Sequence, residues 1–413
     1  MKKISLILIL FFSCSALFAQ SNSPFFDLNA DTTIRWAGGV FANYDVGSNA
    51  ITNSFINKFY SGQFIDSTQK SRVRNKLNNN NRLGGDVNGG IFYLQKLDSS
   101  AHHKNVSWFV SAKSRQHLNM AFSRDLFNVA FYGNDGYKGQ TADFSGFNMS
   151  LVQYQQFQAG LCSDRFGVGL SVYNGQQFMM LQAKTATMYT STFGDYIDFK
   201  TSYNMITSDQ AHTNPGAMNG IGTGLDFYAR MPLQLENGQK GDLFIQLADF
   251  GFIHWNAQTN HYKNDTTFHF DGFVVKNAFQ LADSSVHYSA KNVINAKPYQ
   301  QTSYASYLPA TLDIKFVPSG IKYQFVIGVR YRFVSDYNPY GYGQFRYHFG
   351  KRYTLIAEVG YGGYANFQSG LTLQAKFNNG LSIHLGTNNI LGYLIPDYTC
   401  GQGAFISLSK IFR

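Results

Sequence analysis

Toward its C-terminus the chain alternates apolar and polar side chains, segment after segment, with turns between the segments. Because successive side chains of a β-strand point to opposite faces, each segment predicts a strand with one apolar and one polar face. In the clearest segment, the apolar positions of one parity are Ala365, Phe367, Leu371, Leu373, Ala375 and Phe377. Segments 322–333 and 344–349 repeat the pattern, and only Val326 interrupts the polar face. The pattern predicts a wall with lipid on one side and water on the other.

The length of the segments and of the links between them favours a membrane barrel over a soluble sandwich. Strands of soluble proteins are usually about 5–6 residues long, whereas a strand that crosses a membrane needs about 9–11. Short links alternate with longer ones, as periplasmic turns alternate with extracellular loops in outer-membrane barrels. The short links are Asn378–Asn379, Gly350–Arg352 and Pro318–Gly320, and the longer ones are Asn389–Gly401, Gly362–Tyr364 and Val334–Pro339. This order predicts a periplasmic C-terminus.

The N-terminal half contains strands and two segments with helical spacing. Ile34 to Val46 alternates as a strand, whereas Phe55, Ile56, Phe59 and Tyr60 within 51–77 share one face of a helix. We expect this helical insert to be either a hatch in the lumen or a periplasmic excursion. Ser123 is expected to cap one or two helical turns that run to Tyr132. Strand parity between 176 and 219 is weak and defines no register.

Composition supports an all-β fold, a transmembrane antiparallel β-barrel. Aromatic residues make up 16% of the chain, with 27 Tyr, 38 Phe and 39 Gly, yet the mean hydropathy is −0.22. Aromatic girdles around a polar lumen explain both values together. The segments support an even number of strands, about twelve to sixteen. Residues 20–413 are therefore expected to form one domain, the barrel.

Residues 1–19 are predicted to be a secretory signal peptide. Lys2 and Lys3 precede an apolar stretch, and Ala19 is a plausible last residue before cleavage. Export by this route favours the outer membrane of a Gram-negative cell, and lipidation at Cys14 is the weaker alternative. Two further cysteines, Cys162 and Cys400, could form a disulfide in an oxidising compartment, although both lie at strand ends and possess no defined partner.

The formal net charge is +10, but the basic residues are scattered singly, which excludes a nucleic-acid-binding run. This charge is either ordinary solvated surface or a lumen that favours anions. The polar parity of the C-terminal strands gives the candidate lumen-lining residues, which are Lys322, Arg330, Arg332, Gln344, Arg346, His348, Glu358, Lys376 and His384.

We expect no catalytic residue, no cofactor and no metal site. His102 and His103 have no third ligand nearby, and His254, His261 and His269 lack a recognised metal-binding spacing. Ser382 and His384 share a strand face, but such pairs are too common to indicate a nucleophile and its base. Phosphate-loop spacing is also absent from the glycine-rich segments of the sequence.

Several motifs together resemble those of a family of Bacteroidota outer-membrane barrels, domain of unknown function 5723. They are Asn53-Ser-Phe-Ile, Ser61-Gly-Gln-Phe-Ile-Asp66, Asn81-Arg82, Ser123-Arg-Asp-Leu with Gly133-Asn134, and Leu247-Ala-Asp-Phe-Gly-Phe-Ile-His-Trp255. The family is similar in turn to the long-chain fatty acid transporter superfamily. The resemblance implies a monomeric barrel of about 14 strands with an N-terminal hatch, and it carries over no ligand-binding residue.

Three functions fit these observations. The first is an outer-membrane channel or transporter for a small solute, which the resemblance implies to be hydrophobic. The second is an interaction or secretion-associated scaffold without transport activity, which would contact surface or periplasmic proteins through the loops at Asn277–Pro309 and Asn389–Gly401. The third is a soluble or surface-attached β-protein. In the first two cases the lipid bilayer of the outer membrane is itself a partner.

Overall fold

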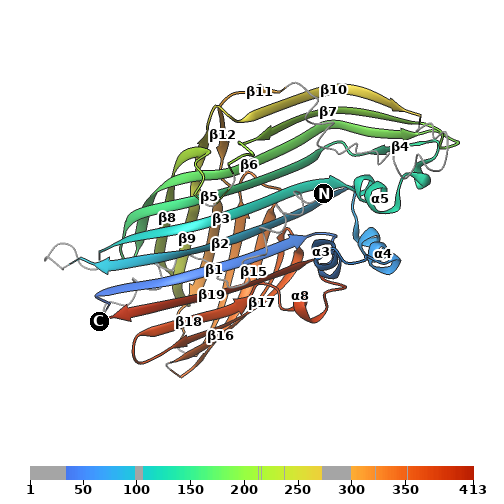
Figure 1. Ribbon diagram of the computed structural model, residues 1–413. Helices are drawn as coiled ribbons and strands as arrows, with labels where there is room; N and C mark the ends of the chain where they lie inside the picture. The colour runs from blue at the N-terminus through green and yellow to red at the C-terminus, as the bar shows by residue number, and fades with distance from the viewer. Residues whose placement is uncertain are drawn as a thin grey trace.

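Fourteen strands close into an antiparallel barrel, which confirms the predicted fold class (Figure 1). The computed structural model describes residues 34–97, 106–271 apart from 213, 215 and 237, and 299–413 apart from 321 and 351. The predicted signal peptide, residues 1–19, lies outside these ranges. Closure is direct, because β1 pairs with β2 on one side and with β19 on the other. In order around the ring, the strands are β1 Trp36–Ser48, β2 Asn80–Lys96, β3 Ser107–Ser123, β5 Phe147–Cys162, β6 Phe166–Thr190, β8 Gly220–Gln234, β9 Lys240–Trp255, β13 Thr311–Pro318, β14 Tyr323–Arg332, β15 Asn338–Phe349, β16 Tyr353–Gly363, β17 Asn366–Lys376, β18 Leu381–Thr387 and β19 Gly401–Phe412.

Five further strands extend the wall beyond the ring. The long strand β6 pairs with β8 along its first part and with β7 along its second part, and β7 in turn pairs with β10. In Figure 1, β7 and β10 continue past the barrel at the end that carries the helices. These additional strands are β4 Gln140–Asp143, β7 Ile197–Thr207, β10 Asn260–Phe270, β11 Gln300–Gln301 and β12 Tyr304–Tyr307.

The two faces of the wall differ as the alternation predicts. On β14, Phe325 is 68% exposed and Ile327 is 64% exposed, whereas Val326 between them is 1% exposed. Outward side chains on the other strands follow the same rule, for example Leu170 and Phe367. An apolar surface that surrounds the whole barrel far exceeds the patches that soluble monomers expose, so it requires a covering of lipid.

The two ends of the barrel carry different connections. The end at which β19 finishes has short turns such as 319–322 and 377–380, and we call it the short-turn end. The first described residues also lie there, because the Arg35 amide donates to the Phe412 carbonyl at 2.8 Å. The opposite end, the helical end, carries the longer links and the helices: α3 Asn53–Tyr60, α4 Ser67–Lys76, α5 Arg124–Tyr132, α8 Leu391–Leu394 and the 3₁₀ turn η1 Asp135–Tyr137. Within the described ranges, no helix is long and apolar enough to span a bilayer.

The insert at 51–77 is helical as predicted, but the interpretation as a lumenal hatch is wrong. Its helices α3 and α4 pack with α5 against Leu83, Met120 and Phe122, which lie on the outward face of β2 and β3. The insert also lies at the end of the barrel opposite the C-terminus. The helix α8 contacts β19, and the hydroxyl of its Tyr393 hydrogen-bonds with that of Tyr44 on β1. We name α3, α4, α5 and α8 together the outer collar.

Buried polar and aromatic contacts fix the outer collar to the wall. The Asn53 side-chain amide donates to the carbonyl of Gly401 at 2.7 Å and of Gly392 at 3.2 Å, which ties α3 to β19 and α8. Phe55 is 3% exposed and packs against the rings of Phe127 and Phe131 of α5. The predicted Ser123 cap is present, because its hydroxyl accepts from the Leu126 amide at 3.1 Å.

Phe55→Ala is expected to loosen the outer collar without opening the barrel. The loss of a buried phenyl ring should weaken collar packing by about 3–5 kcal/mol. Limited proteolysis between α3 and α4 should then accelerate, whereas heat-dependent gel migration and bilayer conductance should stay unchanged. Phe59→Ala is the matched control, since the ring of Phe59 is 54% exposed. A large rise in conductance with Phe55→Ala would instead support the interpretation of residues 51–77 as a hatch.

The two cysteines do not form a disulfide. Both Cys162 and Cys400 are free and buried. Cys162 ends β5 at the short-turn end, and Cys400 precedes β19 at the helical end, so the length of the barrel separates them.

Candidate pore and its constriction

A cluster of charged side chains crosses the middle of the lumen. Asp86 accepts from Arg115 at 3.1 Å and contacts Arg332 Nη1 at 2.5 Å, so one carboxylate serves two guanidinium groups. His117 Nδ1 lies 3.1 Å from the same carboxylate. Arg115 also pairs with Asp249. These side chains come from β2, β3, β9 and β14, so the cluster joins opposite parts of the wall.

Asp249 reaches Arg115 because the wall is irregular at this point. The β8–β9 register shifts between Leu225 and Phe227, and Asp249 has a positive φ of 58°. Its backbone amide donates to Asp226 Oδ1 at 2.8 Å, which holds the bulge. A positive φ is rare for a residue other than glycine and persists only where surrounding contacts fix it. The bulge therefore directs a carboxylate into the lumen.

A second cluster of tyrosines and charged groups continues from the first. The Arg330 guanidinium donates to Asp313 at 2.8 Å, and the Tyr342 hydroxyl donates to the other oxygen of that carboxylate at 2.8 Å. Tyr340 donates to Glu358 at 2.9 Å. Arg330 also lies over the ring of Tyr342, 5.4 Å from its centroid. We call the two clusters together the constriction. Because their groups are paired and stacked in one geometry, the constriction is an ordered structure.

Cavities on either side show that the lumen is divided. A cavity of about 690 Å³ opens toward the short-turn end. A hollow of about 800 Å³ lies at the helical end, between the inner face of β6, β7 and β10 and the loop that contains Asp336. The charged cluster encloses a space of only about 120 Å³. The described conformation is therefore that of a barrel closed in its middle.

The cavity at the short-turn end has two chemically different walls. Ile34, Phe41, Phe405 and Ile411 line it and belong to a buried apolar cluster on one side. The other side is polar, and there basic side chains outnumber acidic ones: Arg230, Lys315, Arg346, Lys376 and Arg413 against Asp242, Asp313 and Glu358. Such a cavity suits a molecule with an apolar body and a negative group.

Two connections from the helical end fold inward over the constriction. In the loop after β14, Asp336 accepts from the Asn119 side-chain amide at 2.7 Å, and its own backbone amide donates to Asn119 Oδ1 at 2.8 Å. In the turn after β16, Tyr364 is 3% exposed and its hydroxyl donates to Asn119 Oδ1 at 3.1 Å. Arg82 holds the same turn by donating to the Gly363 carbonyl at 2.7 Å.

Inward-facing glycines receive the turn that contains Tyr364 and Ala365. A Cβ on Gly84 would lie 2.1 Å from the Tyr364 ring, and a Cβ on Gly401 would lie 2.8 Å from the Ala365 Cβ. At Gly47 the corresponding distance to the Ala365 Cβ is 3.0 Å. These three residues of β1, β2 and β19 form what we call the glycine notch. The notch requires glycine because the Tyr364 ring and the Ala365 Cβ approach the wall too closely for any larger residue.

The predicted lumen-lining residues fall into three places. Arg330 and Arg332 lie in the constriction. His348 lies on the same inward parity and contacts Thr354 Oγ1 at 2.9 Å. The cavity at the short-turn end is lined by Gln344, Arg346, Glu358, Lys376 and His384.

Lys322 was assigned to the lumen by parity, and this assignment is wrong. Its ammonium group lies 5.5 Å from the ring centroid of Tyr323 and 5.7 Å from that of Tyr347. Both rings point outward, because they face each other across β14 and β15 on the apolar parity. Lys322 belongs to a turn, where strand alternation no longer fixes the direction of a side chain.

Sequence reasoning missed the acidic half of the constriction. Asp86 and Arg115 lie on the inward parity of β2 and β3, as Asp313 does on β13. Extension of the alternation to those strands would have found them. Asp249 follows a register shift and could not have been found by parity alone.

The histidines and the Ser382–His384 pair considered in the sequence, together with the two candidate interaction loops, lie in different parts of the chain. Within the described ranges, no group of three or more His, Cys, Asp or Glu side chains could hold a metal ion. Ser382 Oγ lies 3.3 Å from His384 Nε2, on the lumenal face. His102 and His103 lie outside the described residues, as does most of the loop Asn277–Pro309. The link Asn389–Gly401 forms α8 and packs in the outer collar.

Comparisons with known proteins find a family but no curated relative. No curated protein matches the sequence. Among solved structures, the chain is similar to a TodX deltaS2S3 mutant described as a monoaromatic hydrocarbon channel, with 11% identity, 96% of each chain covered and a TM-score of 0.43. It is also similar to the P. putida toluene transporter TodX, with 9% identity, 92% of this chain and 90% of that chain covered, and a TM-score of 0.37. A family model described as "Family of unknown function (DUF5723)" matches residues 36–395, which confirms the resemblance drawn from the sequence motifs.

Proposed function

On the premise that this chain belongs to the family of unknown function DUF5723, we propose that it is an outer-membrane channel for small amphipathic anions. The observation that carries the proposal is a closed barrel with a hollow at each end and a narrow charged constriction between them. A barrel with a purely structural role would not require a cavity at each end. A gated channel between two compartments requires both cavities.

The outer face supports insertion into the outer membrane. It is apolar around the ring, and closure leaves the barrel no free sheet edge. The predicted signal peptide would deliver the chain to this membrane. Both described ends lie at the short-turn end, which we place in the periplasm, and the outer collar then lies on the cell surface.

The nature of the solute follows from the walls of the periplasmic cavity. The apolar cluster around Phe41 and Phe405 would accept a hydrophobic body, and Arg346 and Lys376 on the opposite wall would attract a negative group. A cavity of about 690 Å³ limits the solute to the size of a small organic molecule.

The function can be tested by efflux from liposomes that contain the purified chain. Naphthalene-2-sulfonate should leave faster than a naphthyl trimethylammonium cation of similar size. Arg346→Gln with Lys376→Gln should reduce this anion preference by about two- to fivefold, because the variant removes two lumenal positive charges. Arg165→Gln with Lys240→Gln is the control, since these two residues are exposed at the short-turn rim. Equal efflux from liposomes with and without the chain would contradict a channel.

A further inference from the structure

The outer collar concentrates positive charge outside the wall. Residues 53–77 contain five basic side chains and one acidic side chain. The acidic residue is Asp66, and the basic residues are Lys58, Lys70, Arg72, Arg74 and Lys76. On α4, the four basic residues from Lys70 to Lys76 flank the buried Gln69 and Val73, so the helix packs through one narrow face and presents its basic flanks outward.

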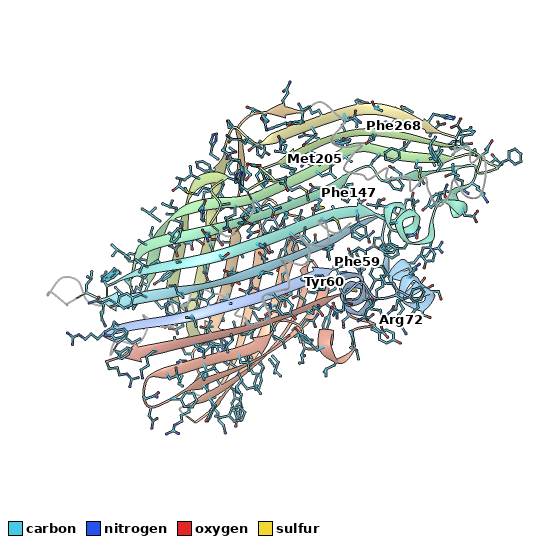
Figure 2. The ribbon with its side chains drawn as sticks, viewed as in Figure 1. Phe59, Tyr60, Arg72, Phe147, Met205 and Phe268 are labelled. Carbon is cyan, nitrogen blue, oxygen red and sulfur yellow. The ribbon has the colours of Figure 1, made fainter. Side chains whose placement is uncertain are left out.

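Exposed apolar and aromatic side chains lie in the same collar. Phe64, between α3 and α4, is 82% exposed, and Phe59, Leu394 and Tyr398 are also exposed. Figure 2 shows Phe59, Tyr60 and Arg72 on the collar at the helical end. Aromatic groups beside lysine and arginine are typical of segments that lie in a membrane interface.

The basic and aromatic groups are arranged as one surface. The Arg74 guanidinium lies 5.1 Å and the Lys70 ammonium 5.9 Å from the centroid of the Tyr132 ring. Arg72 lies 5.2 Å from the Tyr398 centroid and pairs with Asp397 at 2.6 Å. These contacts hold α4 against α5 and against the segment that follows α8, and they leave Arg74 and Lys76 exposed.

We propose that this surface binds the phosphorylated headgroup of an outer-leaflet glycolipid, the class to which lipid A belongs. Because the collar packs on the outward face of β2 and β3, its surroundings in a membrane are lipid and not the lumen. At that level the apolar side chains would contact the upper acyl chains, and the basic flanks would meet phosphate groups. The inference rests on the membrane orientation given under the proposed function.

The experiment is native mass spectrometry of the full chain in a neutral detergent, with bisphosphorylated lipid A as the probe. Arg74→Gln with Lys76→Gln should weaken lipid A binding by roughly tenfold or more, because two positive charges leave the surface. Arg165→Gln with Lys240→Gln, at the opposite rim, should bind like the unaltered chain. Arg74→Lys with Lys76→Arg keeps the charge and should also bind, which separates loss of charge from loss of the collar fold.

The outcomes separate this inference from the proposed function. Phosphatidylcholine that binds the collar as tightly as lipid A would overturn the inference, as would a double glutamine variant with unchanged lipid A affinity. The efflux assay does not depend on α4, so normal efflux with no lipid A binding would remove the lipid site alone. Binding to lipid A without any efflux would support the lipid site and contradict the channel.

Discussion

Replacement of Asp86 with alanine is expected to destabilise the barrel wall itself by about 3–5 kcal/mol. The Asp86 side chain is 6% exposed and is shared by Arg115 and Arg332, which are 11% and 12% exposed. Without the carboxylate, two guanidinium groups would stay buried next to each other with one fewer counter-charge. Urea unfolding in lipid vesicles, followed by the heat-dependent shift on detergent gels, measures the loss.

Asp242→Ala provides the matched control for this prediction. Asp242 pairs with Arg230 at 2.7 Å, but the two side chains are 25% and 33% exposed and water can replace the lost partner. Its cost should be within about 1 kcal/mol. If both alanine variants unfold at the same urea concentration, water already solvates the constriction, and the lumen is more open than the structure shows.

Gly84→Val is expected to open the channel. A side chain at this position would enter the ring of Tyr364, so the turn that carries Tyr364 and Ala365 should leave the glycine notch. In the unaltered chain, burial of Tyr364 stabilises the closed position of the turn by about 1.5–3 kcal/mol. Loss of this stabilisation should raise the frequency of open events in planar bilayers roughly tenfold or more. The recording compares open probability at fixed voltage before and after the substitution.

Two further variants test the mechanism behind this expectation. Gly341→Val places the same side chain on the outward face, where no atom lies within 4 Å, and should leave the open probability unchanged. Tyr364→Ala should open the channel as Gly84→Val does, and the double variant should add little, since both act on the same contact. A Gly84→Val protein that unfolds more easily but never opens would show that the turn only supports the wall.

The C-terminal strands could be predicted from sequence because one physical requirement governs them. Each outward residue must be apolar, so Phe325, Ile327 and Val329 define both the strand and its faces. The same reasoning failed between 176 and 219 because β6 carries two register shifts, one opposite Gln153 and Tyr154 and one between Ala183 and Thr185. Each extra residue exchanges the two faces, so parity read on one side of a shift is wrong on the other.

The site was predictable only in part. Alternation placed Arg330 and Arg332 on the inward face but could not show that Asp86 pairs with Arg332. These residues belong to strands far apart in sequence, and alternation does not indicate which strands face each other across the lumen. Helical spacing likewise identified the insert at 51–77 without its position. An amphipathic helix needs an apolar surface, and both Phe122 on the outside and Phe109 on the inside could have provided one.

The pairing of the first strand with the last has a consequence for biogenesis. Trp36 stacks on Phe412 with ring centroids 3.5 Å apart, so the seam that seals the cylinder joins residues far apart in the sequence. Because β19 is synthesised after every other strand of the ring, β1 lacks this partner until late in biogenesis. Contacts between such distant segments form slowly, and an exported chain in this state exposes aggregation-prone edges. We therefore expect the cylinder to close late in folding, once β19 has reached β1.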